Sequence, residues 1–119
     1  MYDHIGLKVK DLAASIRFYE AVLVPLGHVL GPHDDSYAGI GPPGAPALWL
    51  YAAKDTRSPG THIAFRAGDH QAVTAFHQAG LNAGGRDNGG PGPRPDYSPS
   101  YYAAFLIDPD GNNVEAVCS

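Results

Sequence analysis

The segment DHIGLKV, residues 3–9, has the period of a β-strand. Its apolar residues Ile5, Leu7 and Val9 fall at every second position, so they point to one face of an extended chain. Such alternation is typical of a strand with one buried face. We therefore expect this strand to pack its apolar side against the core and to present His4 on the opposite side.

An amphipathic helix is expected directly after this strand. Asp11 has a side chain that favours the N-cap position, and Pro25 with Gly27 marks the end of the helix. Between them, apolar residues recur at helical spacing: Leu12, Ile16, Tyr19, Val22 and Leu23. This pattern predicts a helix near residues 12–24.

Short extended segments complete a first module of β-α-β-β-β order. They cover residues 27–30, 36–40 and 47–52, and glycine and proline dominate the turns between them. The second half of the chain repeats the order, starting with HIAFR at residues 62–66.

The remaining elements of the second half follow the same order. They are a helix near residues 70–79, capped by Asp69 and stopped by Gly80, a weak strand near 81–86, and strands at 101–107 and 112–117. We therefore predict one α+β domain over residues 1–119, built from two β-α-β-β-β modules at about 1–56 and 60–119.

Composition excludes several classes of protein. Eight lysines and arginines are scattered among twelve acidic residues, for a net charge of -4, and they form no basic stripe for nucleic acid. No apolar run approaches the roughly 20 residues that cross a bilayer, and the chain starts without a basic leader. The single cysteine, Cys118, allows no internal disulfide. We expect a cytoplasmic protein that binds neither nucleic acid nor a membrane.

Three residues with metal-ligand side chains fall on strand faces opposite the apolar ones: His4, His62 and Glu115. If two sheets curl around a common trough with the helices outside, these side chains can converge. Two imidazoles and one carboxylate would hold a divalent ion such as Fe, Mn, Zn or Ni and leave open positions. Alternatively, the histidines are hydrogen-bonded structural residues, and Glu115 pairs with Arg66 or Lys8.

The chain resembles the vicinal oxygen chelate superfamily over essentially its whole length, and three segments carry most of the resemblance. These are DHIGL at residues 3–7, HIAF at 62–65 and, as the most specific part, FLIDPDGNNVE at 105–115. The superfamily includes glyoxalase I, bleomycin-resistance proteins and extradiol dioxygenases. The resemblance implies paired β-α-β-β-β modules around a trough, with metal positions at His4, His62 and Glu115.

One position departs from the glyoxalase I pattern. Glyoxalase I-like members have a fourth protein ligand on the last strand of the first module, where this chain has Trp49. Because indole offers no lone pair to a metal, the pattern is more similar to the three-ligand arrangement of extradiol dioxygenases. Those enzymes place a further histidine or tyrosine near the metal to move protons. The candidates are Tyr51, Tyr97, Tyr101 and Tyr102, of which we select Tyr51 and Tyr102; the alternative for each is a packing role.

Substrate-binding residues are expected on the trough face and in a loop. Trp49 and Arg66 share the predicted trough face and would suit a planar or carboxylated small molecule. The glycine- and proline-rich segment 84–100 is too long for an ordinary connection, and we expect an ordered lid from which Arg94 and Tyr97 reach an anionic or aromatic ligand. Alternatively, Trp49 fills the core and the segment is a surface loop or subunit contact.

Two functions remain open at this point. The first is a metal-dependent enzyme, a lyase, isomerase or extradiol-type dioxygenase, acting on a small oxygen-chelating substrate. The second is a binding protein that sequesters a drug or metabolite without a metal, as bleomycin-resistance proteins do. In both cases we expect a homodimer, because modules of this type expose sheet edges that pair with another module or chain.

Overall fold

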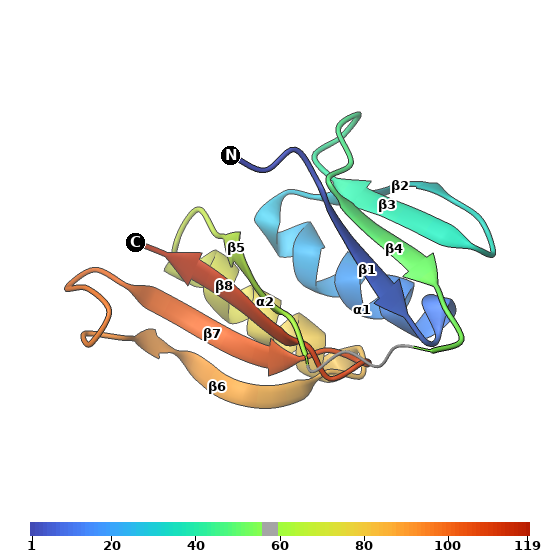
Figure 1. Cartoon of the computed structure of the whole chain (residues 1–119). Coiled ribbons are helices and arrows are strands. Elements are labelled where there is room, and N and C mark those ends of the chain that lie inside the picture. Colours follow the sequence, from blue (N-terminus) through green and yellow to red (C-terminus); the bar gives the residue numbers. More distant parts are fainter. Residues whose placement is uncertain (56–59) are drawn as a thin grey trace.

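The computed structural model describes residues 1–55 and 60–119 and contains two modules with the same order of elements (Figure 1). The first comprises β1 (Ile5–Val9), α1 (Leu12–Leu23), the 3-10 helix η1 (Val24–Leu26), β2 (Val29–His33), β3 (Tyr37–Gly41) and β4 (Leu48–Ala52). The second comprises β5 (His62–Arg66), α2 (His70–Asn82), β6 (Arg86–Pro93), β7 (Tyr102–Ile107) and β8 (Asn113–Cys118). The predicted α+β pair of modules is confirmed, and the boundary expected at residue 56 lies outside the described residues.

Each module is a mixed sheet with one helix on one face (Figure 1). The strand orders are β1-β4-β3-β2 and β5-β8-β7-β6, and in both sheets the opening strand pairs in parallel with the last strand. α1 packs on β3 and β4, α2 packs on β7, β6 and β8, and the two helices pack on each other. The modules therefore share one hydrophobic core. The face of each sheet that points away from the helices is not covered by either helix.

Both helices begin where the sequence predicts. The side chains of Asp11 and Asp69 accept hydrogen bonds from Ala14 N at 3.0 Å and Ala72 N at 2.8 Å, as N-caps do. The second helix, however, passes through Gly80 and ends at Asn82.

Gly80 is needed for close packing and does not end the helix. A Cβ at this position would lie 2.2 Å from Leu106 Cδ1 on β7, so only glycine lets α2 approach the sheet this closely. The strand that we expected near residues 81–86 is present but displaced, because residues 81 and 82 still belong to the helix and β6 begins at Arg86.

The segment expected to be a lid is in part a strand. β6 pairs with β7 at the edge of the second sheet, with register shifts on either side of Gly89. Glycine and proline are tolerated there because an edge strand has only one neighbour and a bulge absorbs the irregular residues. Only residues 94–101 form the connection to β7.

The turn between β7 and β8 ties the second module to the first. Asp108 is 3% exposed, and its Oδ2 accepts a hydrogen bond from the Tyr19 hydroxyl of α1 at 2.5 Å. The next acid of the turn, Asp110, accepts from Lys10 N at 2.9 Å and from the Ser15 hydroxyl at 3.3 Å. The most specific sequence motif of the chain therefore carries contacts that join the modules.

Candidate functional site

A buried carboxylate with two polar partners lies on the open face of the second sheet. Glu115 on β8 is 3% exposed, and its Oε1 lies 3.0 Å from Nε2 of His62 on the neighbouring strand β5. The Tyr101 hydroxyl donates a short hydrogen bond to Oε2 of the same carboxylate. Both oxygens are therefore engaged, as burial of a carboxylate requires. We call His62, Tyr101 and Glu115 the Glu115 cluster.

Strand register explains why these residues meet. Glu115 is paired with Ala64 of β5 on one side and with Phe105 of β7 on the other, so all three side chains lie on one face. His62 is two positions from Ala64, and Tyr101 is four positions from Phe105. Because side chains alternate along a strand, both lie on the same face as Glu115. The side chains of Val114 and Ala116 point instead into the core.

The hydrogen bond between Tyr101 and Glu115 fixes the protonation of the phenol. This hydrogen bond, and to a smaller extent burial, raises the pKa of Tyr101 to about 12. The hydroxyl therefore keeps its proton at neutral pH and acts as a donor to the carboxylate. Tyr97 packs edge to face on the Tyr101 ring, with the ring centroids 5.0 Å apart.

Aromatic and cationic groups extend the Glu115 cluster along β7. The Phe105 ring stacks beside the His62 imidazole, with centroids 6.4 Å apart and planes inclined by 22°. The Arg94 guanidinium lies over the same phenyl ring, 5.4 Å from its centroid. Arg94 and Tyr97 therefore both lie near the Glu115 cluster.

The open face of the first sheet is aromatic. The Trp49 indole lies against Gly39, where a Cβ would come within 2.6 Å of the ring, and the Tyr51 ring lies against Gly6. His4 occupies the same side of β1, is 58% exposed and places its Nδ1 2.7 Å from the Asp3 carboxylate. Glycines on the adjacent strands thus let flat rings lie on the sheet.

Within one chain the three expected metal ligands are not gathered. His62 and Glu115 are in contact, whereas His4 lies on the other module, and residues 1–55 and 60–119 contain no group of three or more His, Cys, Asp or Glu that could hold a metal. The reason is the packing of the two helices on each other, because it joins the modules through their helical faces.

The remaining predicted site residues lie in different places. Arg66 is exposed at the end of β5, opposite Val117. Tyr102 lies on the helix side of β7, where its ring stacks on His70 of α2 with centroids 3.8 Å apart. The tyrosine that reaches Glu115 is Tyr101, and strand alternation could have found it, since Tyr101 shares the parity of Phe105.

Comparison with known proteins places the chain in a family. Residues 2–116 match the model of the Glyoxalase/Bleomycin resistance protein/Dioxygenase superfamily. The chain belongs to this superfamily. Members typically use divalent metals and small-molecule substrates, which agrees with the coarse expectation from the sequence.

Solved structures of the superfamily share the fold of this chain. A glyoxalase/bleomycin resistance protein from Albidiferax ferrireducens T118 is 32% identical, with a TM-score of 0.83 and coverage of 98% of both chains. A putative glyoxalase from Bacillus halodurans is 23% identical, with a TM-score of 0.76 and coverage of 100% of this chain and 96% of that one. A glyoxalase-related enzyme from Fulvimarina pelagi is 20% identical, with a TM-score of 0.71 and coverage of 95% and 84%. No curated protein matches the sequence.

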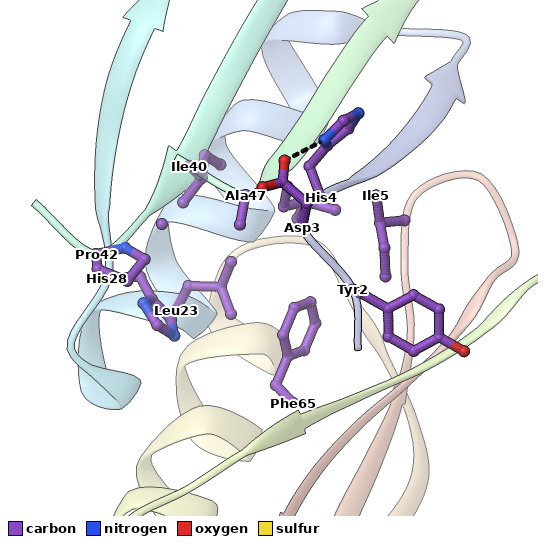
Figure 2. Close-up of a pocket in the computed structure, with 12 residues that line it drawn as sticks. Tyr2, Asp3, His4, Ile5, Leu23, His28, Ile40, Pro42, Ala47 and Phe65 are labelled. Carbon is purple, nitrogen blue, oxygen red and sulfur yellow. Dashed lines mark hydrogen bonds and ion pairs between the residues drawn. The ribbon is translucent and has the colours of Figure 1, made fainter. Parts of the chain in front are cut away.

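In this glyoxalase-superfamily chain a small cavity also lies at the junction of the modules. Its volume is about 160 Å³, and Leu23, Ile40 and Phe65 contribute to an apolar lining (Figure 2). His28 borders it; burial lowers the pKa of this imidazole, and its Nδ1 has no hydrogen-bond partner among the described residues. Figure 2 shows the His4 ring turned to Asp3 and away from Leu23 and Phe65. No residue of the Glu115 cluster lines the cavity, and no sequence pattern indicated it.

The length and hydropathy of the helices among the described residues bear on membrane insertion. Neither α1 nor α2 is long and apolar enough to cross a membrane.

Proposed function

We propose that this chain is a divalent-metal-dependent enzyme of the glyoxalase and dioxygenase type that acts on a small oxygen-chelating substrate. The observation that carries the proposal is the contact of 3.0 Å between the buried Glu115 carboxylate and the half-exposed His62 imidazole. A carboxylate and an imidazole nitrogen, side by side on an open sheet face, are two of the ligands that Fe, Mn, Zn or Ni would take.

We further propose that a second copy of the chain completes the site with its His4. His4 is 58% exposed on the open face of the first module, so it is free to approach another chain. In a two-fold homodimer, the open face of the first module of each chain would lie on the open face of the second module of its partner. This arrangement would bring Trp49 and Tyr51 over the Glu115 cluster as walls of one ligand site.

The residues of the chain would then have separate roles in metal binding, proton transfer and substrate binding. His62 and Glu115, with His4 of the second copy, would hold a divalent ion, which would supply Lewis-acid stabilisation of negative charge on the substrate. Tyr101 would hold the Glu115 carboxylate in place for the ion, and Tyr51 would be the proton carrier. Arg94 and Tyr97 would contact the end of the substrate that is remote from the ion, while Trp49 would cover it and exclude water.

A binding protein without a metal is the second candidate. The observation in its favour is that both Glu115 oxygens already have protein partners, so the carboxylate is satisfied with no ion present. In that case the open aromatic face of the first module would hold the ligand by stacking.

Chain-mixing separates a shared metal site from a site within one chain. We expect His4→Ala and Glu115→Ala homodimers each to take up almost no Mn²⁺, because every shared site would lack a ligand. Heterodimers of the two variants would contain one intact site, so refolding an equal mixture should restore about a quarter of the parental metal content, as random pairing gives. Metal analysis of each preparation after dialysis provides the measurement.

The outcomes of this mixing experiment decide between the candidates. No recovery in the mixture, with metal in the parent, would show that each site lies within one chain. Metal below about 0.1 per chain in the parent, after dialysis against Mn, Fe, Ni and Zn, would favour the metal-free binding protein. Light scattering on the same samples reports whether the chain is a dimer.

Tyr101→Phe is expected to weaken metal binding about 10-fold while the fold persists. The substitution removes only the hydroxyl that holds Glu115 Oε2, and loss of such a supporting hydrogen bond typically costs 10- to 100-fold in metal affinity. Tyr102→Phe is the matched control, since the neighbouring ring lies on the opposite face, stacked on His70. Calorimetric titration with Mn²⁺ measures both affinities, and equal values for the two variants would exclude the positioning role of Tyr101.

A further inference from the structure

Arg94 is held rigidly at the start of the turn between β6 and β7. Its backbone N–H donates to Tyr101 O at 2.7 Å, and its carbonyl accepts from Tyr97 N at 3.0 Å. The residue is therefore fixed in the same hairpin that carries Tyr101 of the Glu115 cluster.

The guanidinium of Arg94 is also fixed, by carbonyl groups of the preceding strand, β6. Nη2 donates to Gly90 O at 2.8 Å, and Nη1 donates to Gly92 O at 2.9 Å and to Pro93 O at 3.3 Å. The glycines of β6 provide the room for it, because a Cβ at Gly89 or Gly92 would lie 3.3 Å from a guanidinium nitrogen. The sequence GGPGPR is therefore arranged around this side chain.

These contacts pair the Arg94 guanidinium with no acidic side chain. Carbonyl oxygens are neutral, and Arg94 takes part in none of the ion pairs found among the described residues. A guanidinium has five N–H groups, of which the three bonds to carbonyls use three. Two donors remain, enough for the side-on contact of an arginine with one carboxylate.

The Arg94 guanidinium lies close to the Glu115 cluster. Arg94 Cζ lies 5.4 Å from the Phe105 centroid, and the His62 ring lies 6.4 Å from the same centroid, so Arg94 and His62 are at most about 12 Å apart. A small planar molecule can span that distance. Phe105, which neighbours both groups, supplies an apolar surface for such a molecule.

We infer that Arg94 is an anion-binding residue and that the substrate of this chain carries a carboxylate. This inference rests on the proposed function, because it places the oxygen pair of the substrate at His62 and Glu115 and the carboxylate at Arg94. One guanidinium matches the single charge of a carboxylate, and its preorganised position means that little side-chain entropy is lost on binding.

Two probes that differ only in charge test the inference. 3,4-Dihydroxybenzoate and its neutral amide, 3,4-dihydroxybenzamide, have the same diol and nearly the same shape. We expect the carboxylate to bind the Mn²⁺-loaded parent protein about 10-fold more tightly than the amide, as a charge-assisted arginine contact gives. Calorimetric titration measures both dissociation constants.

Variants of two arginines that lie at opposite ends of β6, Arg94 just after it and Arg86 at its first residue, locate the effect. Arg94→Gln should abolish the preference for the carboxylate, and Arg94→Lys, which keeps the charge but not the paired donors, should retain part of it. Arg86→Gln is the matched control, since Arg86 is an exposed arginine at the other end of β6 and should keep the full preference. Circular dichroism verifies that each variant is folded.

The outcomes distinguish this inference from the proposed function. Equal affinity of the parent for the two probes, or a preference that survives in folded Arg94→Gln, would overturn the anion site even if Mn²⁺ binds normally. If the parent takes up no Mn²⁺ but still prefers the carboxylate in an Arg94-dependent way, the metal site fails and the anion site stands. Should Arg94→Gln not fold, the intermediate preference expected of Arg94→Lys decides the matter in the same titration.

Discussion

Replacing Glu115 with alanine is expected to lower the affinity of the protein for Mn²⁺ by about 100-fold or more. Glu115 is the one anionic ligand of the proposed site, and two imidazoles alone hold a divalent ion weakly. Loss of a supporting group already costs 10- to 100-fold, and loss of a direct ligand should exceed that. Titration of metal-free protein with Mn²⁺ measures the change.

The fold of the Glu115→Ala variant should survive. The substitution frees the half-exposed His62 to bind water and leaves one part-buried donor, the Tyr101 hydroxyl, without its partner. The free energy of unfolding of the metal-free protein should therefore fall by only about 1–3 kcal/mol. His77→Ala is the control, because His77 pairs with Asp87 away from the Glu115 cluster and should leave metal binding unchanged.

Two results would contradict the assignment of Glu115. In one, Glu115→Ala binds Mn²⁺ as tightly as the parent protein. In the other, the variant unfolds although the parent holds no metal, which would make Glu115 a structural partner of His62 and Tyr101 and would favour the binding protein.

Local patterns in the sequence predict the elements and their faces well. The alternation in residues 3–9 and 62–66 correctly assigns Leu7 and Ile63 to the core, because the period of a strand depends only on local geometry. The caps Asp11 and Asp69 mark both helix starts for the same reason. The prediction that Gly80 ends the second helix is wrong, because the role of Gly80 depends on its contact with Leu106. Leu106 is 26 positions away, so no local pattern reveals this contact.

The relation between the modules is not encoded in such patterns. Whether His4 meets Glu115 in one chain depends on how α1 and α2 pack, and that packing is set by many apolar contacts of similar kind. The choice of Tyr102 over Tyr101 has a different origin. A shift of one residue reverses the face of a strand, and Tyr101 lies just before the first residue of β7.

The turn of residues 108–112 should contribute strongly to stability. Asp108 accepts hydrogen bonds from the Tyr19 hydroxyl at 2.5 Å, from the backbone N–H groups of Asp110 and Asn112, and from the Asn112 side chain. Burial, together with the nearby Asp108 charge, raises the pKa of Tyr19, so its hydroxyl stays protonated and remains a donor. One carboxylate thus joins a turn of the second module to a helix of the first.

Asp108→Ala is expected to lower the free energy of unfolding by about 3–4 kcal/mol, because it leaves several buried donors without an acceptor. Tyr19→Phe removes only one of these donors and should cost about 1–2 kcal/mol. Asp96→Ala, in the exposed turn after β6, is the matched control and should change stability by less than about 0.5 kcal/mol. Urea unfolding of the metal-free proteins measures all three values. A cost for Asp108→Ala no greater than that for Asp96→Ala would mean that the hydrophobic core alone holds the modules together, and that the most specific motif of the chain serves another purpose.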